Sequence, residues 1–230
     1  MSAVQLVTGV IEARGLGIGV WVLFAVAAVL ALTDWWAVAG EHRPVELFAK
    51  PATMLPLIVS AAAMPTSETV LRGWFVVGLV CSLVGDVFLM SQPPERWFVP
   101  GLAAFLVGHL AYIVGLLAGG VDRVAVVIGA VMVVAAVFVL GPKVLAGARR
   151  EDPRLVSPVA AYIGVISVMV VCAIGSTVWL AILGAVLFYL SDLCIGWSSF
   201  VGPFRHSRLV IITTYHLAQA LLVASIHLSR

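Results

Sequence analysis

The stretch Cys81-Ser82-Leu83-Val84-Gly85-Asp86-Val87-Phe88-Leu89-Met90 places a carboxylate inside an apolar run that is long enough to lie in lipid. An Asp at the centre of a membrane helix costs roughly 2.5–3.5 kcal/mol on insertion scales, so it normally has a partner, a water-filled cavity or a chemical role. A second carboxylate within an apolar run lies downstream, where Asp192 follows Phe188-Tyr189-Leu190-Ser191. We therefore expect a helical membrane bundle that holds these two carboxylates.

The composition indicates a polytopic membrane protein of one domain, residues 1–230. The chain is 63% hydrophobic and 10% charged, whereas a soluble domain has about 25% charged residues. The net charge is +2 and no basic patch is interleaved with aromatic residues, so we expect no nucleic-acid partner. The three cysteines lie in apolar runs, which argues against a disulfide framework. The composition does not fix an oligomeric state.

The spans are expected to be α-helices of roughly 20 apolar residues, because backbone polar groups in lipid must be satisfied within the chain. Eight runs qualify, at residues 16–33, 47–64, 70–91, 98–118, 124–141, 158–175, 177–196 and 208–227. The fold class is thus an all-α bundle of about eight transmembrane helices. We expect Lys50-Pro51 to begin the second helix, Gly175-Ser176-Thr177 to form the shortest turn, and residues 141–157 to form the longest connection.

Lys and Arg residues near the span ends predict the orientation in the membrane. Four lie on one side and nine on the other, the nine being Arg43, Lys50, Arg96, Lys143, Arg149, Arg150, Arg154, Arg205 and Arg208. The positive-inside rule places the second side in the cytoplasm and both termini outside. The excess of Arg over Lys is a bias of high-GC bacterial genomes, so we expect a multi-pass protein of a bacterial plasma membrane.

With this orientation, the strongly polar residues of the spans gather at the depth of the cytoplasmic leaflet. Asp86 and Asp192 are expected about 6 Å from the cytoplasmic ends of their helices, at 1.5 Å per residue. The others near this depth are Lys50, Tyr162, Tyr215, His216 and Gln219, with His109 deeper. A purely structural bundle has no reason for this gathering. It favours an active site reached from the cytoplasmic leaflet.

The same separation recurs in the two halves of the chain. His109 lies 23 residues after Asp86, and Tyr215 lies 23 residues after Asp192. A duplication of four spans would produce this pattern and would keep both halves in one orientation, with the pseudo-two-fold axis along the membrane normal. A helix–loop–helix unit of ordinary length in a membrane would produce it as well, so both explanations stay open.

Asp86 and Asp192 are the candidate general acid and base. Two carboxylates that share a site ionise one after the other, so one can hold a proton while the other is anionic. The structural alternative is that each caps a helix end or pairs with Lys50 or an Arg. His109 shares a helix face with Phe105 and Tyr112, and it is either a packing residue or a functional one.

The remaining polar residues have two interpretations each. Tyr215 and Gln219 face one way on their helix and would make interhelical hydrogen bonds or contact a substrate. Lys50 would either snorkel or hold a phosphate or carboxylate. A zinc site drawn from Asp86, His109, Asp192 and His216 is a further alternative, but the chain lacks His-x-x-x-His and Glu-x-x-His spacings. We expect no metal and no cofactor.

Five pieces of sequence follow one another along the expected helices. They are Lys50-Pro51, Ser82 to Met90 around Asp86, Phe105-x-x-Gly108-His109-x-x-Tyr112, Gly184-Ala185-x-x-Phe188-x-x-Ser191-Asp192, and Thr214-Tyr215-x-x-x-Gln219. In order and spacing, they resemble the lysoplasmalogenase family of eight-helix membrane proteins. The resemblance covers residues 47 to 225. His216 departs from it, because a second aromatic residue, commonly Tyr, is expected there, so His216 is a poor candidate for an essential role.

The resemblance implies hydrolysis of the vinyl ether bond of a lysoplasmalogen in the membrane, which yields a fatty aldehyde and a glycerophospho-base. Asp86, Asp192, His109 and Tyr215 would be catalytic, and Lys50, Tyr112, Tyr162 and Gln219 would bind the substrate, Lys50 through the phosphate. Protonation of the vinyl β-carbon would leave an oxocarbenium ion, a cation that glycosidases also meet with two carboxylates. The alternatives are another ether lipid as substrate, an amide or ester hydrolase, and a transporter that uses the carboxylates as a proton relay.

Overall fold

The computed structural model describes residues 3–229, with side chains for residues 17–93 and 96–229. Within that part, the chain forms eight long α-helices and no strand. All eight are long and apolar enough to cross a membrane, which confirms the predicted fold class of a multi-pass membrane protein. The helices are α1 (Ala3–Ala39), α2 (Arg43–Ala63), α3 (Thr69–Met90), α4 (Pro94–Ala118), α5 (Arg123–Glu151), α6 (Val156–Gly175), α7 (Trp179–Phe200) and α8 (Ser207–Ser225).

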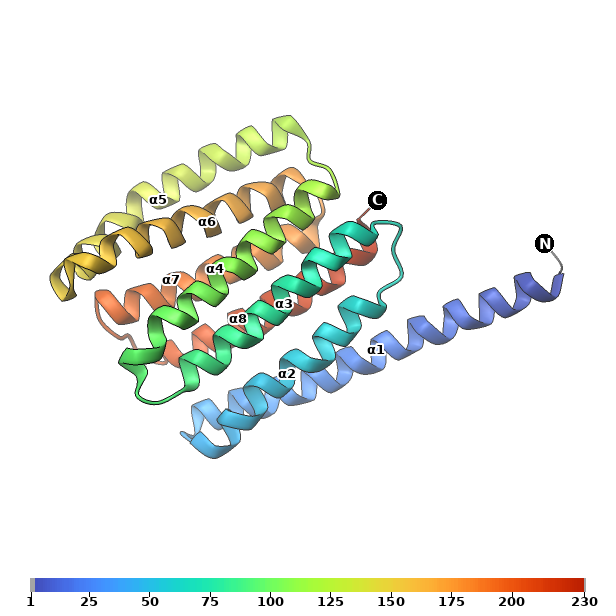
Figure 1. The fold of residues 1–230 in the computed structure, drawn as a ribbon, viewed down its shortest axis with the longest axis horizontal. Helices are drawn as coiled ribbons and strands as arrows, with labels where there is room; N and C mark the ends of the chain where they lie inside the picture. Colours follow the sequence, from blue (N-terminus) through green and yellow to red (C-terminus); the bar gives the residue numbers. More distant parts are fainter. Residues whose placement is uncertain (1–2, 230) are drawn as a thin grey trace.

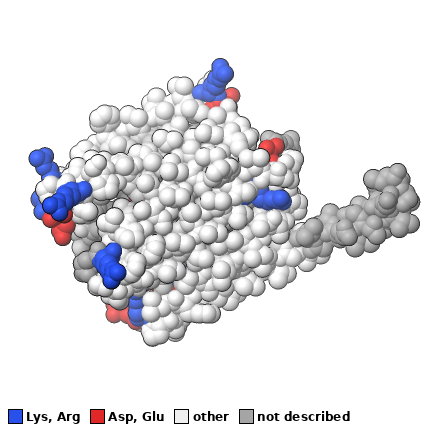
Figure 2. Space-filling model, in the orientation of Figure 1, with Lys and Arg blue, Asp and Glu red and all other residues white. Residues whose placement is uncertain are grey.

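Successive helices run antiparallel, so the connections α1–α2, α3–α4, α5–α6 and α7–α8 all lie at one end of the bundle (Figure 1). We call this end the basic end, because it carries Arg43, Arg96, Lys143, Arg150 and Arg208. Figure 2 shows charged side chains near the two ends and a broad uncharged surface between them. An uncharged belt between charged ends is the surface that a lipid bilayer requires.

Glycines let the helices of two pairs approach closely. A Cβ added to Gly108 of α4 would lie 3.1 Å from the carbonyl oxygen of Gly78 on α3. On the other pair, a Cβ added to Gly184 of α7 would lie 3.1 Å from the carbonyl oxygen of Ala218 on α8. Small residues at helix contacts are the usual means of close packing in membranes, where no hydrophobic force distinguishes protein from lipid. The α3–α4 and α7–α8 pairs therefore form a rigid support for the carboxylates that α3 and α7 carry.

Several predicted helix boundaries are wrong, and prolines explain two of them. α2 begins at Arg43, with Pro44 in its first turn, and Pro51 lies inside the helix. α5 continues through Pro142 to Glu151, so the long connection predicted for residues 141–157 is largely helical. Membrane helices tolerate an internal proline, because neighbouring groups satisfy the carbonyl that it leaves free. The turn after α6 is as predicted, with Thr177 in the left-handed region at φ 57°.

Two further helices are longer than predicted. α1 runs to Ala39, six residues beyond the expected end, and α7 runs to Phe200, four residues beyond it. Asp34 therefore lies inside a helix rather than after it. Asp192 lies eight residues before the end of α7, about 12 Å at 1.5 Å per residue. The predicted depth of about 6 Å for Asp192 is thus wrong by one helical turn.

Candidate active site

Asp86 of α3 is sealed inside the bundle and is bound by two groups. The Nζ atom of Lys50 on α2 lies 3.0 Å from its Oδ1 atom, and the Tyr215 hydroxyl on α8 donates to its Oδ2 atom at 2.6 Å. Asp86 is 0% exposed, and Lys50 is mostly buried. A buried charge pair recovers its desolvation cost only when extra hydrogen bonds satisfy the remaining lone pairs, as the Tyr215 hydroxyl does here.

Asp192 of α7 has a different environment. The Tyr162 hydroxyl on α6 donates to its Oδ2 atom at 2.6 Å, and the Nε2 atom of His109 on α4 lies 3.5 Å from the same oxygen. The His109 contact is too long for a good hydrogen bond. In the described part of the chain, no Lys or Arg forms an ion pair with Asp192. The two carboxylates therefore differ, since Asp86 has a cationic partner and Asp192 does not.

Aromatic rings connect the two carboxylate sites. The Phe188 ring of α7 packs edge-on to His109, with centroids 4.6 Å apart, and edge-on to Tyr215, with centroids 5.5 Å apart. Phe105 of α4 packs edge-on to both Phe188 and Tyr215. Phe188 is fully buried. This aromatic layer holds the side chains that contact Asp86 and Asp192 in fixed positions relative to each other.

A cavity of about 60 Å³ lies beside Asp192. The residues around it come from α3 to α7 and are mostly apolar, and Tyr162, Tyr189 and Asp192 are its ionisable members. A water needs about 10–15 Å³ measured in this way, so the space suits several waters or a short length of hydrocarbon. Asp86 is not among the lining residues. Asp192 is thus the carboxylate that a bound molecule can reach.

A second apolar cavity, of about 110 Å³, adjoins the first. The two share Phe98, Leu102, Val159 and Tyr162 as lining residues, and the second extends between α4 and α6. Ala103 and Ala161 contribute to this second part. The two cavities are thus neighbours that share apolar walls from α4 and α6. Such a lining suits a single hydrocarbon chain.

Tyr112 and Gln219 bond to each other rather than to either carboxylate. The Tyr112 hydroxyl donates to the Gln219 Oε1 atom at 2.6 Å, across α4 and α8, and both residues are fully buried. This is the interhelical hydrogen bond that the sequence allowed as an alternative for Gln219. Neither residue lines the Asp192 cavity. Their predicted role in substrate binding stays a prediction, and the structure places them away from the cavity.

His216 belongs to the α1 side of the bundle. Its Nδ1 atom accepts from the Nε1 atom of Trp35 at 3.2 Å, and the two rings stack with centroids 6.4 Å apart. Among the described residues, no three His, Cys, Asp or Glu side chains lie close enough together to hold a metal ion. The His216 side chain is therefore engaged by α1, and Asp86 by Lys50.

Asp34 of α1 is a buried carboxylate that was not predicted from the sequence. It is 0% exposed, and neither of its oxygens has a hydrogen-bond partner among the described residues. The neighbouring Trp35 and Trp36 are typical of a helix end at the membrane surface, so the span was expected to stop before them. The signal that could have identified Asp34 is an apolar run that resumes at Ala37-Val38-Ala39.

The contacts of the two carboxylates follow one pattern. Each takes a partner from the helix before its own, Lys50 of α2 for Asp86 and Tyr162 of α6 for Asp192. Each takes a second partner from the last helix of the other half, Tyr215 of α8 for Asp86 and His109 of α4 for Asp192. A two-fold relation between α1–α4 and α5–α8 predicts this exchange. The duplication itself stays a prediction.

The fold and the site define an integral membrane bundle with a carboxylate that opens on an apolar cavity. A family model described as the YhhN family matches residues 45–226, and the chain belongs to this family. The match begins in the first turns of α2 and ends after α8, so it includes both carboxylates and their partners but not α1. No solved structure matches the chain.

Curated relatives named lysoplasmalogenase confirm the family that the five sequence pieces resemble. The human lysoplasmalogenase TMEM86B is 37% identical over 150 residues, which cover 64% of this chain and 60% of that protein. The pig lysoplasmalogenase TMEM86B is 32% identical over 223 residues, 94% of this chain and 90% of that protein. A Mycobacterium tuberculosis lysoplasmalogenase is 35% identical over 190 residues, 78% of this chain and 69% of that protein.

Proposed function

We propose that this protein is a lysoplasmalogenase, a membrane enzyme that hydrolyses the vinyl ether bond of a lysoplasmalogen to a fatty aldehyde and a glycerophospho-base. The observation that carries the proposal is the position of Asp192, which lacks a cationic partner in the described chain and faces an apolar cavity within the bundle. The relatives named lysoplasmalogenase supply the reaction. A vinyl ether with a hydrocarbon tail needs a proton donor inside an apolar cavity, and this site supplies both.

The environments of the two carboxylates support different roles for them. Asp86 is ionised because Lys50 compensates its charge at 3.0 Å. Asp192 holds a proton in the resting enzyme, because an isolated carboxylate without a cation is costly in an apolar interior. Asp192 is thus the general acid, with the Tyr162 hydroxyl fixing its orientation through the 2.6 Å hydrogen bond.

The reaction proceeds in three steps. The Asp192 carboxyl group donates its proton to the β-carbon of the vinyl ether, and the electron pair of the double bond forms the new C–H bond. The resulting oxocarbenium ion lies against the new Asp192 carboxylate, which stabilises it. Water then adds to the cationic carbon and gives a proton to Asp192. The hemiacetal collapses to the aldehyde and the glycerol hydroxyl, and Asp192 is again protonated.

His109 and Asp86 act through position and charge. His109 lies 3.5 Å from Asp192 and lines no part of the cavity, so it acts on the Asp192 carboxyl group rather than on the substrate. Asp86 does not line the cavity, so it contributes through its contacts with Lys50 and Tyr215 and through the aromatic layer that Tyr215 shares with Phe188. We therefore assign Asp86, Lys50 and Tyr215 as positioning residues rather than groups that touch the substrate.

In the proposed complex, the alkenyl chain occupies the apolar cavities beside Asp192. The second cavity lies between α4 and α6 and shares four lining residues with the first, so the chain lies along these two helices. A hydrocarbon chain gains about 0.8 kcal/mol per buried CH₂ only when it leaves water, so its position here depends on fit rather than on hydrophobic force. This explains why the polar groups near Asp192 decide where the vinyl ether lies.

The product distinguishes this function from the alternatives. The purified protein in nonionic detergent is incubated with lysoplasmenylethanolamine, and the released lipid products are measured. A vinyl ether hydrolase releases fatty aldehyde in detergent, because it needs no sealed membrane. Release of fatty acid would indicate an amide or ester hydrolase, and absence of any product from folded protein would leave transport as the function to test.

Removal of the Tyr162 hydroxyl should slow turnover and leave the fold intact. In Tyr162→Phe, Asp192 loses the 2.6 Å hydrogen bond but keeps its cavity. We expect kcat for aldehyde release to fall about two- to tenfold, since one hydrogen bond contributes about 0.5–1.5 kcal/mol. Tyr189→Phe is the matched control, because Tyr189 lines the same cavity without bonding Asp192. Equal kcat values for the two variants would contradict the role of Tyr162.

We also propose that the basic end faces the cytoplasm and that both termini lie outside a bacterial plasma membrane. The support is the excess of Lys and Arg at the basic end, from Arg43 of α2 to Arg208 of α8. In this orientation Asp192 lies at the depth of the cytoplasmic leaflet, and the substrate enters from that leaflet. An impermeant thiol reagent, applied to intact cells, distinguishes the two orientations in variants whose single cysteine replaces Ser229 or Asp152. We expect labelling at position 229, outside the membrane, and none at position 152, on the cytoplasmic side.

A further inference from the structure

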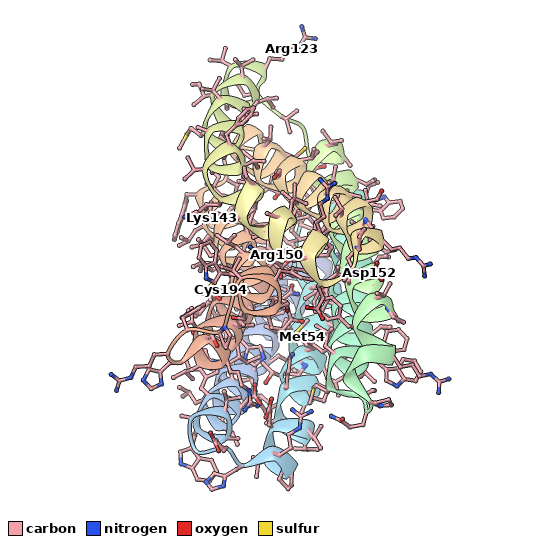
Figure 3. The ribbon with its side chains drawn as sticks, turned by 90° about the vertical axis from the view of Figure 1, so that its left-hand side faces the viewer. Met54, Arg123, Lys143, Arg150, Asp152 and Cys194 are labelled. Carbon is pink, nitrogen blue, oxygen red and sulfur yellow. The ribbon has the colours of Figure 1, made fainter. Side chains whose placement is uncertain are left out.

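Lys143 of α5 is a cation at the basic end, next in sequence to a residue that lines the Asp192 cavity. None of the ion pairs in the described chain includes it, and its side chain is exposed. Its neighbour Val144 lines the cavity. Figure 3, which looks onto the basic end, shows Lys143 on the α5 flank, away from α1 and α2. Arg43 and Arg208, at the same end, both bind Glu46 instead.

An aromatic ring fixes the position of the Lys143 ammonium group. Its Nζ atom lies 5.6 Å from the ring centroid of Trp197 on α7. Trp197 follows Gly196, which also lines the cavity. The contact with the ring joins the Lys143 side chain of α5 to α7. The ammonium group therefore lies beside the α7 segment that follows Asp192, in which Gly196 lines the cavity.

The spacing along α7 matches the dimensions of a lysophospholipid. Trp197 lies five residues after Asp192, about 7.5 Å toward the basic end at 1.5 Å per residue. In a glycerophospholipid, five single bonds of about 1.5 Å separate the ether oxygen from the phosphorus, which is roughly 6 Å for a zigzag chain. When the vinyl ether lies at Asp192, the phosphodiester therefore lies at the level of Lys143.

We propose that Lys143 binds the phosphodiester of the substrate headgroup and so selects phospholipids over uncharged alkenyl glycerols; this assignment rests on the proposed function. A Lys ammonium group binds phosphate as a point charge, without the fixed geometry of an Arg. Lys50, for which the sequence predicted this role, has Asp86 as its partner. The headgroup site and the catalytic carboxyl group thus lie about one and a half turns apart on the α7 side of the cavity.

The test compares two substrates that differ in the phosphate. Wild type and Lys143→Met are assayed in nonionic detergent with lysoplasmenylethanolamine and with a 1-alkenylglycerol of the same chain, which lacks the phosphodiester. We expect KM for the phospholipid to rise about tenfold in Lys143→Met, with kcat within a factor of two. KM for the alkenylglycerol should stay within a factor of two, and Lys143→Arg should restore most of the phospholipid affinity.

Arg149→Met is the matched control. Arg149 lies six residues further along α5, is exposed and contacts no aromatic ring face among the described residues, so this variant loses the same charge at the same end. It should leave both KM values unchanged. An unchanged KM for the phospholipid in Lys143→Met, or an equal rise for both substrates, would overturn the headgroup assignment. Failure of wild type to release aldehyde from either substrate would instead overturn the proposed function.

Discussion

Replacement of Asp192 by Asn should abolish aldehyde release while the protein stays folded. Asn has nearly the shape of Asp and can still accept the Tyr162 hydrogen bond, but it cannot donate a proton to carbon. General acid catalysis contributes typically 10²–10⁴-fold, so we expect kcat for lysoplasmenylethanolamine to fall by about 10³-fold or more. The measurement is the initial rate of aldehyde release in detergent, beside the thermal unfolding midpoint of the same preparation.

Asp152→Asn is the control for this variant. Asp152 accepts from the backbone nitrogen of Arg154 in the α5–α6 connection, far along the chain from the cavity residues of α7. This change also replaces a carboxylate by an amide, but at the basic end, and it should leave kcat within a factor of two. If Asp192→Asn folds and keeps full turnover, Asp192 is not the proton donor and the proposed mechanism is wrong.

Breaking the Lys50–Asp86 pair on one side should destabilise the bundle more than removing both charges. Lys50→Met leaves the Asp86 carboxylate buried with the Tyr215 hydroxyl as its hydrogen-bond donor. Removing one partner of a buried ion pair costs about 3–5 kcal/mol, because the other charge stays buried and uncompensated. The double variant Lys50→Met/Asp86→Asn leaves no buried charge at this position. We expect it to unfold at a higher temperature than Lys50→Met.

The double-mutant cycle measures this coupling directly. Wild type, Lys50→Met, Asp86→Asn and the double variant are compared by thermal unfolding in one detergent. Arg43→Met provides the counterpart at the basic end, since Arg43 is half-exposed and Glu46 keeps Arg208 as a partner when Arg43 is removed, so we expect a smaller loss. If the losses from the two single changes add up in the double variant, Asp86 is not held ionised by Lys50, and the division of roles between the carboxylates fails.

Apolar run length was enough to predict the eight helices, because a bilayer permits few other structures. The errors lie where a sequence signal has two meanings. Pro142 marks a helix end in a soluble protein, yet α5 continues through it. Asp34-Trp35-Trp36 has the composition of a membrane surface, yet α1 carries it into the bundle. In each case the packing of neighbouring helices decides, and one sequence does not contain that information.

The residues of the candidate site could be predicted from the sequence, but the different environments of its two carboxylates could not. Asp86 and Asp192 follow from the cost of a carboxylate in lipid. Which of them has Lys50 as its partner depends on how α2 packs against α3, and which faces a cavity depends on the space between α4, α6 and α7. The sequence contains no signal for Lys143 beyond its charge, because its proposed role depends on its contact with Trp197 across α5 and α7.

Hydrolysis in deuterated water tests the central claim most directly. The purified protein turns over lysoplasmenylethanolamine in D₂O, the aldehyde is reduced at once to the alcohol, and its mass and deuterium position are determined. Protonation of the vinyl β-carbon by Asp192 predicts one solvent deuterium on the carbon next to the former aldehyde carbon, formed by wild type and lost with turnover in Asp192→Asn. An aldehyde without solvent deuterium at that carbon, or a fatty acid in its place, would contradict the account.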